Sequence, residues 1–457
     1  MTFPHAIFKA YDIRGIVDNT LTAEIAYKIG QAVGSEVIAN GGDSIVIGRD
    51  GRMSGPMLAE VLSNGLRAAG VNVIDIGLAP SPVVYYSSYS KGIPSCIAIT
   101  GSHNPPDYNG FKMVVDGVTL SAERIQDLKQ RILDENFSQG EGSYVQEQII
   151  EDYIARIVGD IKLEREMKIV IDSGNGVAGA TAPQLFRAIG CEVIDLFSEV
   201  DGTFPNHHPD PSQIENLQDL IAAVKEHDAE LGLAFDGDGD RLGVVTKKGE
   251  IIWADRQMIL FAQDVLSRDP GAEIIYDVKC SRNLPAAIEA AGGKATMWRT
   301  GHSFIKAKLK QTEAALAGEM SGHIFFKERW FGFDDGVYAG ARLLELLSKR
   351  QESPQQVFDA LADSVNTPEL RIDFDEGEHY VFMDKLKQVA DFGDASVSKI
   401  DGLRVDYTDG FGLIRPSNTT PILVLRFEAD SEHAIARIQA DFKAAIAQVD
   451  PNLTTPF

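Results

Sequence analysis

The stretch Leu231-Gly232-Leu233-Ala234-Phe235-Asp236-Gly237-Asp238-Gly239-Asp240-Arg241 decides the fold. Its first five residues form a short, unbroken apolar run, which is typical of a parallel strand buried on both faces. Acidic residues alternating with glycine follow at once. Loops at the carboxyl ends of strands in open α/β sheets are where ligands bind. The stretch therefore predicts an α/β fold with a polar site at the end of a buried strand.

The same arrangement recurs three times along the chain. Each copy begins with an apolar strand and continues into an amphipathic helix that stops at small residues and a glycine, namely Gly70, Gly190 and Gly292. Glycine just beyond a helix fits a left-handed cap. The three opening strands are expected at residues 44–49, 168–172 and 273–277. Strand, helix and strand at this spacing predict βαβ units and mixed, mainly parallel sheets.

Each copy then reaches another strand that ends in an unusual loop. These loops are Thr100–Pro105, Asp236–Arg241 and Gly318–His323. We expect three similar α/β domains that each contribute one loop to a central cleft. The alternative is that the repeats share ancestry but no function.

The last part of the chain has a different pattern. Strand-like segments at 369–374, 397–400, 403–407 and 422–428 surround helices without the βαβ repeat. A final helix is expected after Ser431, because a serine accepts hydrogen bonds from the free N–H groups at a helix start. This predicts a smaller C-terminal α+β domain, joined near residues 366–368. The predicted domains are 1–148, 149–250, 251–366 and 367–457.

Composition excludes several function classes. The chain has 43 basic and 67 acidic residues and a net charge of −24, so its surface repels nucleic acid and anionic membranes. No apolar run reaches the roughly 18 residues of a membrane span, and no signal peptide is visible. Cys96, Cys191 and Cys280 are too few and too widely spaced for a disulfide framework. We expect a cytoplasmic protein, and the absence of a coiled-coil pattern favours a monomer.

The acidic loop is the strongest candidate site. In an extended chain alternate side chains project the same way, so Asp236, Asp238 and Asp240 would aim at one point. Three carboxylates suit Mg²⁺ or another hard divalent cation. An EF-hand is excluded, because Arg241 stands where glycine is required and Lys247 where glutamate is required. A solvated acidic turn is the alternative.

Ser102 is the candidate carrier of a phosphoryl group. It lies between Gly101 and the Asn104-Pro105 pair, in a loop that would expose its hydroxyl, and Lys112 adds a nearby cation for charge neutralisation or proton transfer. A serine-hydrolase triad is disfavoured because the G-x-S-x-G elbow is absent. The alternative is an ordinary turn.

Two further loops suit a phosphorylated sugar. Glu319, Ser321 and His323 occupy alternate positions and would each grasp a ring hydroxyl, with His323 also able to act as acid or base. In the last domain Arg415 precedes Ser417, Asn418 and two threonines, and we expect these residues to form one tight loop that clamps a phosphate.

Taken together, these motifs resemble those of the α-D-phosphohexomutase family, and most closely its bacterial members that act on mannose and glucose phosphates. The resemblance covers the whole chain in the family's order. It is carried by Phe8–Gly15, Thr100–Pro105, Asp236–Arg241, Gly318–His323 and Arg415–Pro421.

The resemblance implies an isomerase that interconverts hexose 1-phosphates and 6-phosphates. Ser102 would be phosphorylated and would share Mg²⁺ with Asp236, Asp238 and Asp240. The phosphoserine would transfer its phosphoryl group to the substrate, form glucose 1,6-bisphosphate or its mannose counterpart, and then recover the other phosphate. Glucose 1,6-bisphosphate would therefore also act as an activator.

The resemblance also assigns roles to other residues. Lys112 and His323 would serve as acid and base, with Arg241 and Arg14 stabilising charge. Substrate contacts would come from Tyr11, Lys279, His302, Glu319, Met320, Ser321, Gly322, His323, Arg415, Ser417, Asn418 and Thr419.

Specificity is expected to be relaxed at the sugar's second carbon. If Glu319 and Ser321 hold the O3 and O4 hydroxyls, which are equatorial in both sugars, glucose and mannose phosphates are both accepted. The alternatives are a phosphoglucosamine mutase, a metal-dependent sugar phosphatase and a non-catalytic phosphosugar-binding protein.

Overall fold

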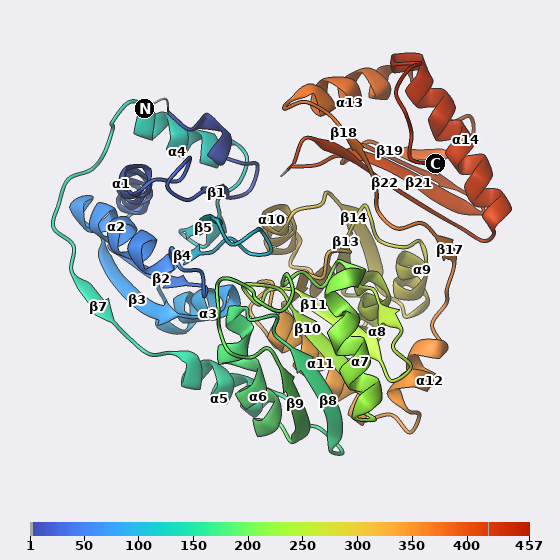
Figure 1. Ribbon diagram of the computed structural model, residues 1–457, viewed down its shortest axis with the longest axis horizontal. Coiled ribbons are helices and arrows are strands. Elements are labelled where there is room, and N and C mark those ends of the chain that lie inside the picture. Colours follow the sequence, from blue (N-terminus) through green and yellow to red (C-terminus); the bar gives the residue numbers. More distant parts are fainter. Residues whose placement is uncertain (1–2, 419) are drawn as a thin grey trace.

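The computed structural model describes residues 3–418 and 420–457 and contains four β-sheets (Figure 1). Three sheets mix parallel and antiparallel strands, and the C-terminal sheet is wholly antiparallel. The predicted fold, three similar α/β domains followed by a smaller α+β domain, is confirmed. Within the described residues no helix has both the length and the apolar character needed to cross a membrane.

The first three sheets share one four-strand unit. In each unit the first strand lies between the second and the third, all three parallel, and the fourth is antiparallel to the third. The strands are β2 (Ser44–Arg49), β3 (Asn72–Leu78), β4 (Cys96–Ile99) and β5 (Tyr108–Val115); β8 (Met167–Asp172), β9 (Cys191–Leu196), β10 (Leu231–Phe235) and β11 (Leu242–Thr246); β13 (Glu273–Asp277), β14 (Lys294–Trp298), β15 (Leu316–Gly318) and β16 (Ile324–Phe326). The three candidate loops occupy the same position, between the third and fourth strands.

The helix between the first two strands of each unit ends as predicted. Helices α2 (Gly55–Ala68), α6 (Ala182–Ala188) and α9 (Asn283–Ala290) are followed by Gly70, Gly190 and Gly292, which have φ values of +100°, +101° and +79°. The other helices of these domains are α1 (Ala23–Ala39), α3 (Ser81–Lys91), α4 (Glu123–Leu133), α5 (Ile150–Asp160), α7 (Gln218–Glu226), α8 (Ala254–Arg268), α10 (His302–Thr312), α11 (Gly336–Ser348) and α12 (Pro354–Asp359). The remaining strands are β1 (Ile13–Ile16), β6 (Val118–Thr119), β7 (Tyr144–Gln146) and β12 (Ile251–Ile252).

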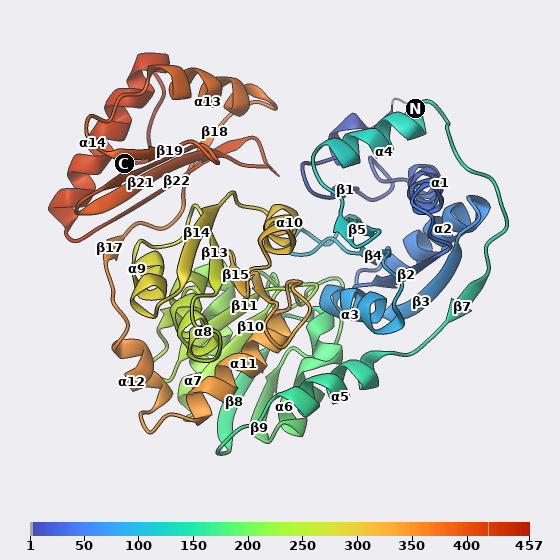
Figure 2. The ribbon, with the colours of Figure 1, turned by 180° about the vertical axis from the view of Figure 1, so that it is seen from behind.

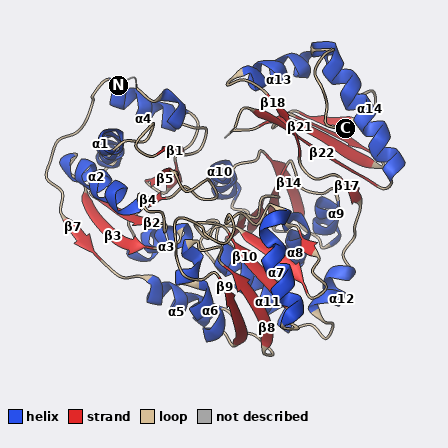
Figure 3. Cartoon of the chain, in the orientation of Figure 1, coloured by secondary structure: helices blue, strands red, loops and turns tan. Residues whose placement is uncertain are grey.

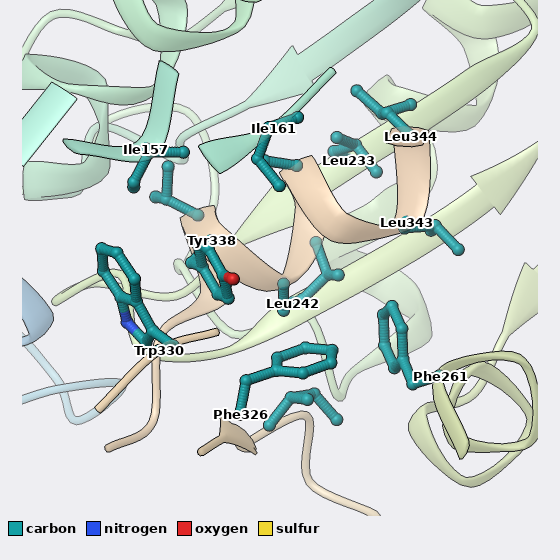
Figure 4. Packing of buried hydrophobic residues seen from close by; sticks show 14 of the residues in the cluster. Ile157, Ile161, Leu233, Leu242, Phe261, Phe326, Trp330, Tyr338, Leu343 and Leu344 are labelled. Atoms are coloured by element: carbon teal, nitrogen blue, oxygen red, sulfur yellow. The ribbon is translucent and has the colours of Figure 1, made fainter. Parts of the chain in front are cut away.

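One apolar core joins the first three domains. Every residue of α11 is buried, and its side chains pack against Leu233 and Leu242 of the second sheet and Phe326 of the third (Figure 4). The same cluster reaches Val83 and Val84 of α3 in the first domain. Because packed cores resist deformation, this shared cluster holds the three loop-bearing domains together.

The C-terminal domain has a core of its own. Figures 1 and 2 show it above the third domain and opposite the first, and Figure 3 shows its two helices lying together on one face of its sheet. Its cluster draws its residues only from positions 365–457. The elements are β17 (Val365–Asn366), β18 (Leu370–Asp373), α13 (Glu378–Val389), β19 (Ser396–Ser398), β20 (Leu403–Tyr407), β21 (Gly410–Pro416), β22 (Ile422–Ala429) and α14 (Glu432–Val449).

The strand segments and the final helix predicted in this domain are present, but strands β17 and β21 of its sheet were not predicted. The Ser431 side chain accepts the N–H of Ala434 and caps α14 as expected. Strand β21 was not predicted, because Gly410 and Gly412 interrupt its apolar pattern. A Cβ atom at Gly412 would lie 2.4 Å from the Phe442 ring, so α14 can pack on the strand only where that side chain is missing.

Candidate active site

The hydroxyl of Ser102 lies beside the acidic loop. Ser102 follows β4 and has a left-handed backbone with φ of +49°, but it is only 1% exposed, so the expectation that this loop exposes its hydroxyl is wrong. Its Oγ donates to Asp236 Oδ2 at 3.1 Å and lies 3.2 Å from His103 Nδ1. The strained backbone at this residue is typical of a functional position. The first and second domains therefore bring together the nucleophile and the carboxylates that the sequence singled out.

The three carboxylates converge through a turn and not through an extended segment. Asp236 Oδ1 accepts the N–H groups of Asp240 at 3.0 Å and Arg241 at 3.1 Å, and Gly239 has φ of +78°. One oxygen from each of Asp236, Asp238 and Asp240 lies within 4.8 Å of the others. The predicted convergence is thus present, and a turn produces it instead of the expected alternation of an extended chain.

Gly237 permits the close approach of the two loops. A Cβ atom at this position would lie 2.3 Å from the backbone oxygen of Ser102. Any larger residue would push the serine away from the carboxylates.

Lys112 projects from β5 into the acidic loop. Its Nζ lies 2.7 Å from Asp238 Oδ2 and 2.6 Å from Asp240 Oδ2, and all three side chains are buried. Burial lowers the pKa of Lys112, but the surrounding carboxylates raise it by more, so the ammonium stays charged. Burial raises the pKa of Asp238, and Lys112 outweighs this and lowers it; the pKa of Asp236 is raised well above its usual range by burial and by its acidic neighbours.

The residues present fit a hard divalent cation. Asp238 Oδ1 and Asp240 Oδ1 are buried and have no hydrogen-bond partner among the residues that the structure describes, while the other oxygen of each carboxylate accepts from Lys112. Carboxylate oxygens are the ligands that Mg²⁺ prefers. Burial and the neighbouring carboxylates raise the pKa of both Asp236 and Asp240, and a bound cation would relieve this repulsion. A second group, formed by Asp240, His323 and Asp334, is close enough to hold an ion, but its imidazole makes it a less suitable set for Mg²⁺.

The third loop joins the acidic loop through an isolated antiparallel bridge between Arg241 and His323. Arg241 Nε donates to His323 Nε2 at 3.0 Å, and His323 Nδ1 lies 3.0 Å from Asp334 Oδ2. Because Nε2 accepts a hydrogen bond here, the proton of the neutral ring belongs on Nδ1, where it faces the Asp334 carboxylate.

The alternate spacing of Glu319, Ser321 and His323 predicts that their side chains face the same way. In the structure they do not. The Ser321 hydroxyl donates to Glu319 Oε2 at 3.2 Å, whereas His323 turns toward Asp334 and Arg241. The loop is a turn in which Gly322, with φ of +101°, donates its N–H to the Glu319 carbonyl. Met320 donates its N–H to Asp277 Oδ1 at 3.2 Å.

Two predicted substrate-binding residues meet between the first and third domains. The rings of Tyr11 and His302 pack edge to face with centroids 5.2 Å apart. Burial and the neighbouring Asp12 raise the pKa of Tyr11 to about 12. Burial and Lys306 hold the pKa of His302 well below its usual value, so its ring is neutral. Arg14, in β1, donates to Asn104 of the Ser102 loop.

Two of the predicted substrate-binding cations, Lys279 and Arg415, each pair with a carboxylate of the C-terminal domain. Lys279 Nζ lies 2.8 Å from Glu369 Oε1, and Arg415 Nε donates to Asp401 Oδ2 at 2.9 Å. Asp401 Oδ2 also accepts the N–H of Thr300 at 3.0 Å, which ties the third domain to the fourth.

The predicted phosphate clamp is only partly a loop. Arg415 lies near the end of strand β21, and Ser417 and Asn418 follow in the turn toward β22. The Ser417 carbonyl accepts from His379 and from the Tyr380 hydroxyl, both at 3.2 Å. Thr419 lies outside the described residues. Arg415 therefore projects from a strand, and its guanidinium is held by Asp401, which lies between β19 and β20.

Several residues that complete the site were not predicted. Asp334 binds Lys306 at 3.0 Å as well as His323, and the buried Arg52 donates to the Ser102 carbonyl at 2.9 Å. Asp50, next to Arg52, accepts the Thr100 hydroxyl at 2.7 Å. Asp50 and Arg52 follow the end of strand β2, the kind of position that identified the other loops, so this signal was present in the sequence.

Family models match the chain in four consecutive segments. They describe phosphoglucomutase/phosphomannomutase α/β/α domain I at residues 5–139, domain II at 151–249, domain III at 253–365 and the C-terminal domain at 369–445.

Bacterial relatives match along almost the full length of the chain. A phosphomannomutase/phosphoglucomutase of Pseudomonas putida is 56% identical over 454 residues, covering 99% of this chain and 98% of the relative. A phosphoglucomutase of Neisseria meningitidis serogroup A is 56% identical and covers 98% of each chain. The crystal structure of a phosphoglucomutase/phosphomannomutase family protein from Burkholderia thailandensis superposes with a TM-score of 0.94, at 56% identity and 99% coverage of each chain.

Proposed function

Because the chain belongs to the phosphoglucomutase/phosphomannomutase family, we propose that it is an isomerase that interconverts hexose 1-phosphates and hexose 6-phosphates of glucose and mannose. A phosphoryl group carried by Ser102 passes to the sugar, a 1,6-bisphosphate forms and turns over in the cleft, and its other phosphate returns to Ser102. The product hexose 1-phosphates are precursors of nucleotide sugars.

One observation carries this proposal. The Ser102 hydroxyl, 1% exposed, donates to Asp236 at 3.1 Å inside a group of three carboxylates that also binds the Lys112 ammonium. Phosphoryl transfer depends on alignment and charge neutralisation more than on covalent chemistry. Mg²⁺ held by Asp236, Asp238 and Asp240 would supply further positive charge to the phosphate oxygens. Arg14 and Arg241 add cations from β1 and from the acidic loop.

Lys112 and His323 divide the proton transfers. Lys112 remains protonated beside Asp238 and Asp240, so it can give a proton to Ser102 Oγ as the phosphoryl group leaves. His323 Nε2 carries a lone pair, and Asp334 at Nδ1 stabilises the imidazolium that forms when Nε2 takes the proton of the attacking sugar hydroxyl. Arg241, which binds Nε2 here, would move to the phosphate.

The sugar and the phosphate that is not transferred are held by the other two loops. Glu319 and Ser321 bind the O3 and O4 hydroxyls, and Arg415, with Ser417, anchors the phosphate. The remaining substrate contacts are assigned to Tyr11, Lys279, His302, Met320, Gly322, Asn418 and Thr419.

The proposal is tested by measuring kcat/KM for glucose 1-phosphate and mannose 1-phosphate with Mg²⁺ and glucose 1,6-bisphosphate. Conversion of both substrates with comparable kcat/KM is expected, and a large gap between them would contradict the proposed grip on O3 and O4. Release of inorganic phosphate without a requirement for a bisphosphate would instead indicate a phosphatase. Faster turnover of glucosamine 6-phosphate than of either hexose phosphate would indicate a phosphoglucosamine mutase.

The covalent intermediate has its own test. Intact mass spectrometry with peptide mapping, before and after incubation with glucose 1,6-bisphosphate, is expected to find one phosphate on Ser102. A phosphate on any other residue, or none under conditions where the enzyme turns over, would contradict the mechanism. We further propose that the enzyme acts as a cytoplasmic monomer.

A further inference from the structure

A second hollow lies away from the site described above, at the seam between the third and fourth domains. It has a volume of about 530 Å³. The third domain lines it with Trp298 at the end of β14, Arg299, and Phe304, Lys308 and Gln311 of α10; the fourth domain contributes Ile400. Small-molecule sites usually have volumes of roughly 300–1,000 Å³, so the hollow is large enough for a nucleotide-sized ligand.

Two cations line this hollow on aromatic supports. The Arg299 guanidinium lies 4.4 Å from the centroid of the Phe304 ring, and Lys308 Nζ lies 4.5 Å from that of Trp298. Among residues 3–418 and 420–457, neither cation forms an ion pair with a carboxylate. Lys308 is close enough to Glu273 to help lower the pKa of that carboxyl, but Glu273 forms its ion pair with Lys294, at 3.0 Å.

Within the described residues, Arg299 and Lys308 carry positive charges that no direct carboxylate partner neutralises, in a chain whose net charge is −24. Two cations that share one hollow and pair with none concentrate positive potential there, and this attracts an anion. An arginine that stacks on an aromatic ring also presents its other planar face for stacking.

The hollow is connected to the proposed active site through residues that are adjacent in the sequence. Arg299 and Ile400 immediately precede Thr300 and Asp401, whose hydrogen bond of 3.0 Å joins the two domains. Asp401 also holds Arg415 at 2.9 Å. A ligand that contacts both Arg299 and Ile400 would therefore displace the Thr300–Asp401 hydrogen bond, and Asp401 is the residue that positions Arg415.

We propose that this hollow is a regulatory binding site for an organic phosphate of the nucleoside diphosphate class. The planar base stacks on the Arg299–Phe304 pair, the phosphates bind Arg299 and Lys308, and the Gln311 amide donates to a phosphate oxygen. Occupancy shifts the Thr300–Asp401 contact, so the ligand changes KM for the hexose phosphate and leaves kcat nearly unchanged.

The test uses the full-length enzyme and the fluorescence of Trp298, one of three tryptophans in the chain. GDP, UDP, inorganic pyrophosphate and glucose 6-phosphate are titrated separately, with the proposed active site saturated by glucose 1,6-bisphosphate. We expect saturable quenching by a nucleoside diphosphate. The Arg299→Gln/Lys308→Gln double variant should weaken binding by about tenfold or more, because two charge-assisted contacts are lost.

Matched controls separate this site from other effects. Trp298→Phe should remove the fluorescence signal while calorimetry still detects binding, and Lys310→Gln, a cation on the same helix that donates to Gly117 and does not line the hollow, should bind as the wild type does. Unchanged affinity in the double variant, equal affinity for pyrophosphate and nucleotide, or no saturable binding would overturn the proposal. The double variant without nucleotide should keep wild-type mutase kinetics, so a failure of this inference differs from a failure of the proposed activity.

Discussion

The seam between the first and second domains differs from the seam between the third and fourth. At the first seam the proposed reacting groups themselves are in contact. Lys112 binds Asp238 and Asp240, and Ser102 Oγ donates to Asp236 at 3.1 Å. Ser81 adds a further hydrogen bond to Asp238. All of these side chains are buried.

The second seam is built mainly from supporting contacts. Arg404 donates to the carbonyls of Val278 at 2.8 Å and Cys280 at 2.7 Å, and Ser281 donates to Glu428 at 2.7 Å. The proposed ligand-binding cation there, Lys279, pairs with Glu369, whose side chain is 35% exposed.

The difference between the two seams predicts that substitutions in them have different effects. Breaking a buried charge group leaves uncompensated charges and is costly, whereas a partly exposed ion pair contributes little and exchanges easily. Substitutions at the first seam should therefore abolish turnover, and substitutions at the second should adjust substrate binding.

Replacing the proposed nucleophile should have the largest effect. Ser102→Ala should lower the mutase rate by at least ~10³-fold, because the residue that carries the phosphoryl group is lost. Steady-state assays with glucose 1-phosphate measure this. The matched control is Ser87→Ala, another fully buried serine of the first domain, which should retain nearly full activity. Substantial turnover by the Ser102 variant would rule out the first seam as the place of reaction.

Removing the cation of the first seam should be the next most severe change. Lys112→Met should lower kcat by about 10²–10⁴-fold. It should also destabilise the Mg²⁺-free protein by about 3–5 kcal/mol, because Asp238 and Asp240 lose their counterion. Thermal unfolding with and without Mg²⁺ measures this, and Mg²⁺ should raise the unfolding midpoint more in the variant than in the wild type.

A lysine outside the seam provides the control. Lys91→Met removes a partly exposed ion pair with Glu147 and should change both the rate and the stability little. If both lysine variants behaved alike, burial of the first seam would not be the cause of its importance.

At the second seam the expected effect is modest. Glu369→Gln should lower KM for hexose phosphate by about two- to fivefold at nearly constant kcat, since Lys279 would no longer be shared with a carboxylate. Asp373→Asn, an exposed change on β18, should leave KM unaltered. A rise in KM for the Glu369 variant would mean that this carboxylate assists binding.

The smallest effect is expected at His207, a histidine of the second domain that lies outside the group of reacting residues. Burial lowers the pKa of His207, but the Asp172 carboxylate, 3.0 Å away, raises it by more. A raised pKa in the folded state gives stability that is fully present below the unfolded value, about 6.5, and is lost as pH rises through the folded value. His207→Gln should therefore lower the thermal midpoint more at pH 6 than at pH 9. An equal or larger loss at pH 9 would contradict this.

The sequence alone identified the residue types and their places along the chain. The repeated strand–helix–glycine pattern predicted the α/β units, and the position of Ser102, Asp236 and Glu319 just after buried strands marked three of the loops. These features are local, because a strand, its cap and the loop that follows are set by neighbouring residues. Resemblance to a known family then supplied the proposed chemistry.

Only the tertiary structure decided which atoms face one another. It brought Lys112 to Asp238 and Asp240, turned His323 toward Asp334, and set Arg415 near the end of a strand that the sequence did not reveal. These contacts join segments far apart in the chain and from different domains. Their geometry depends on how packed domains meet and on which side-chain rotamers that packing leaves open, and neither quantity is encoded in the pattern of any one segment.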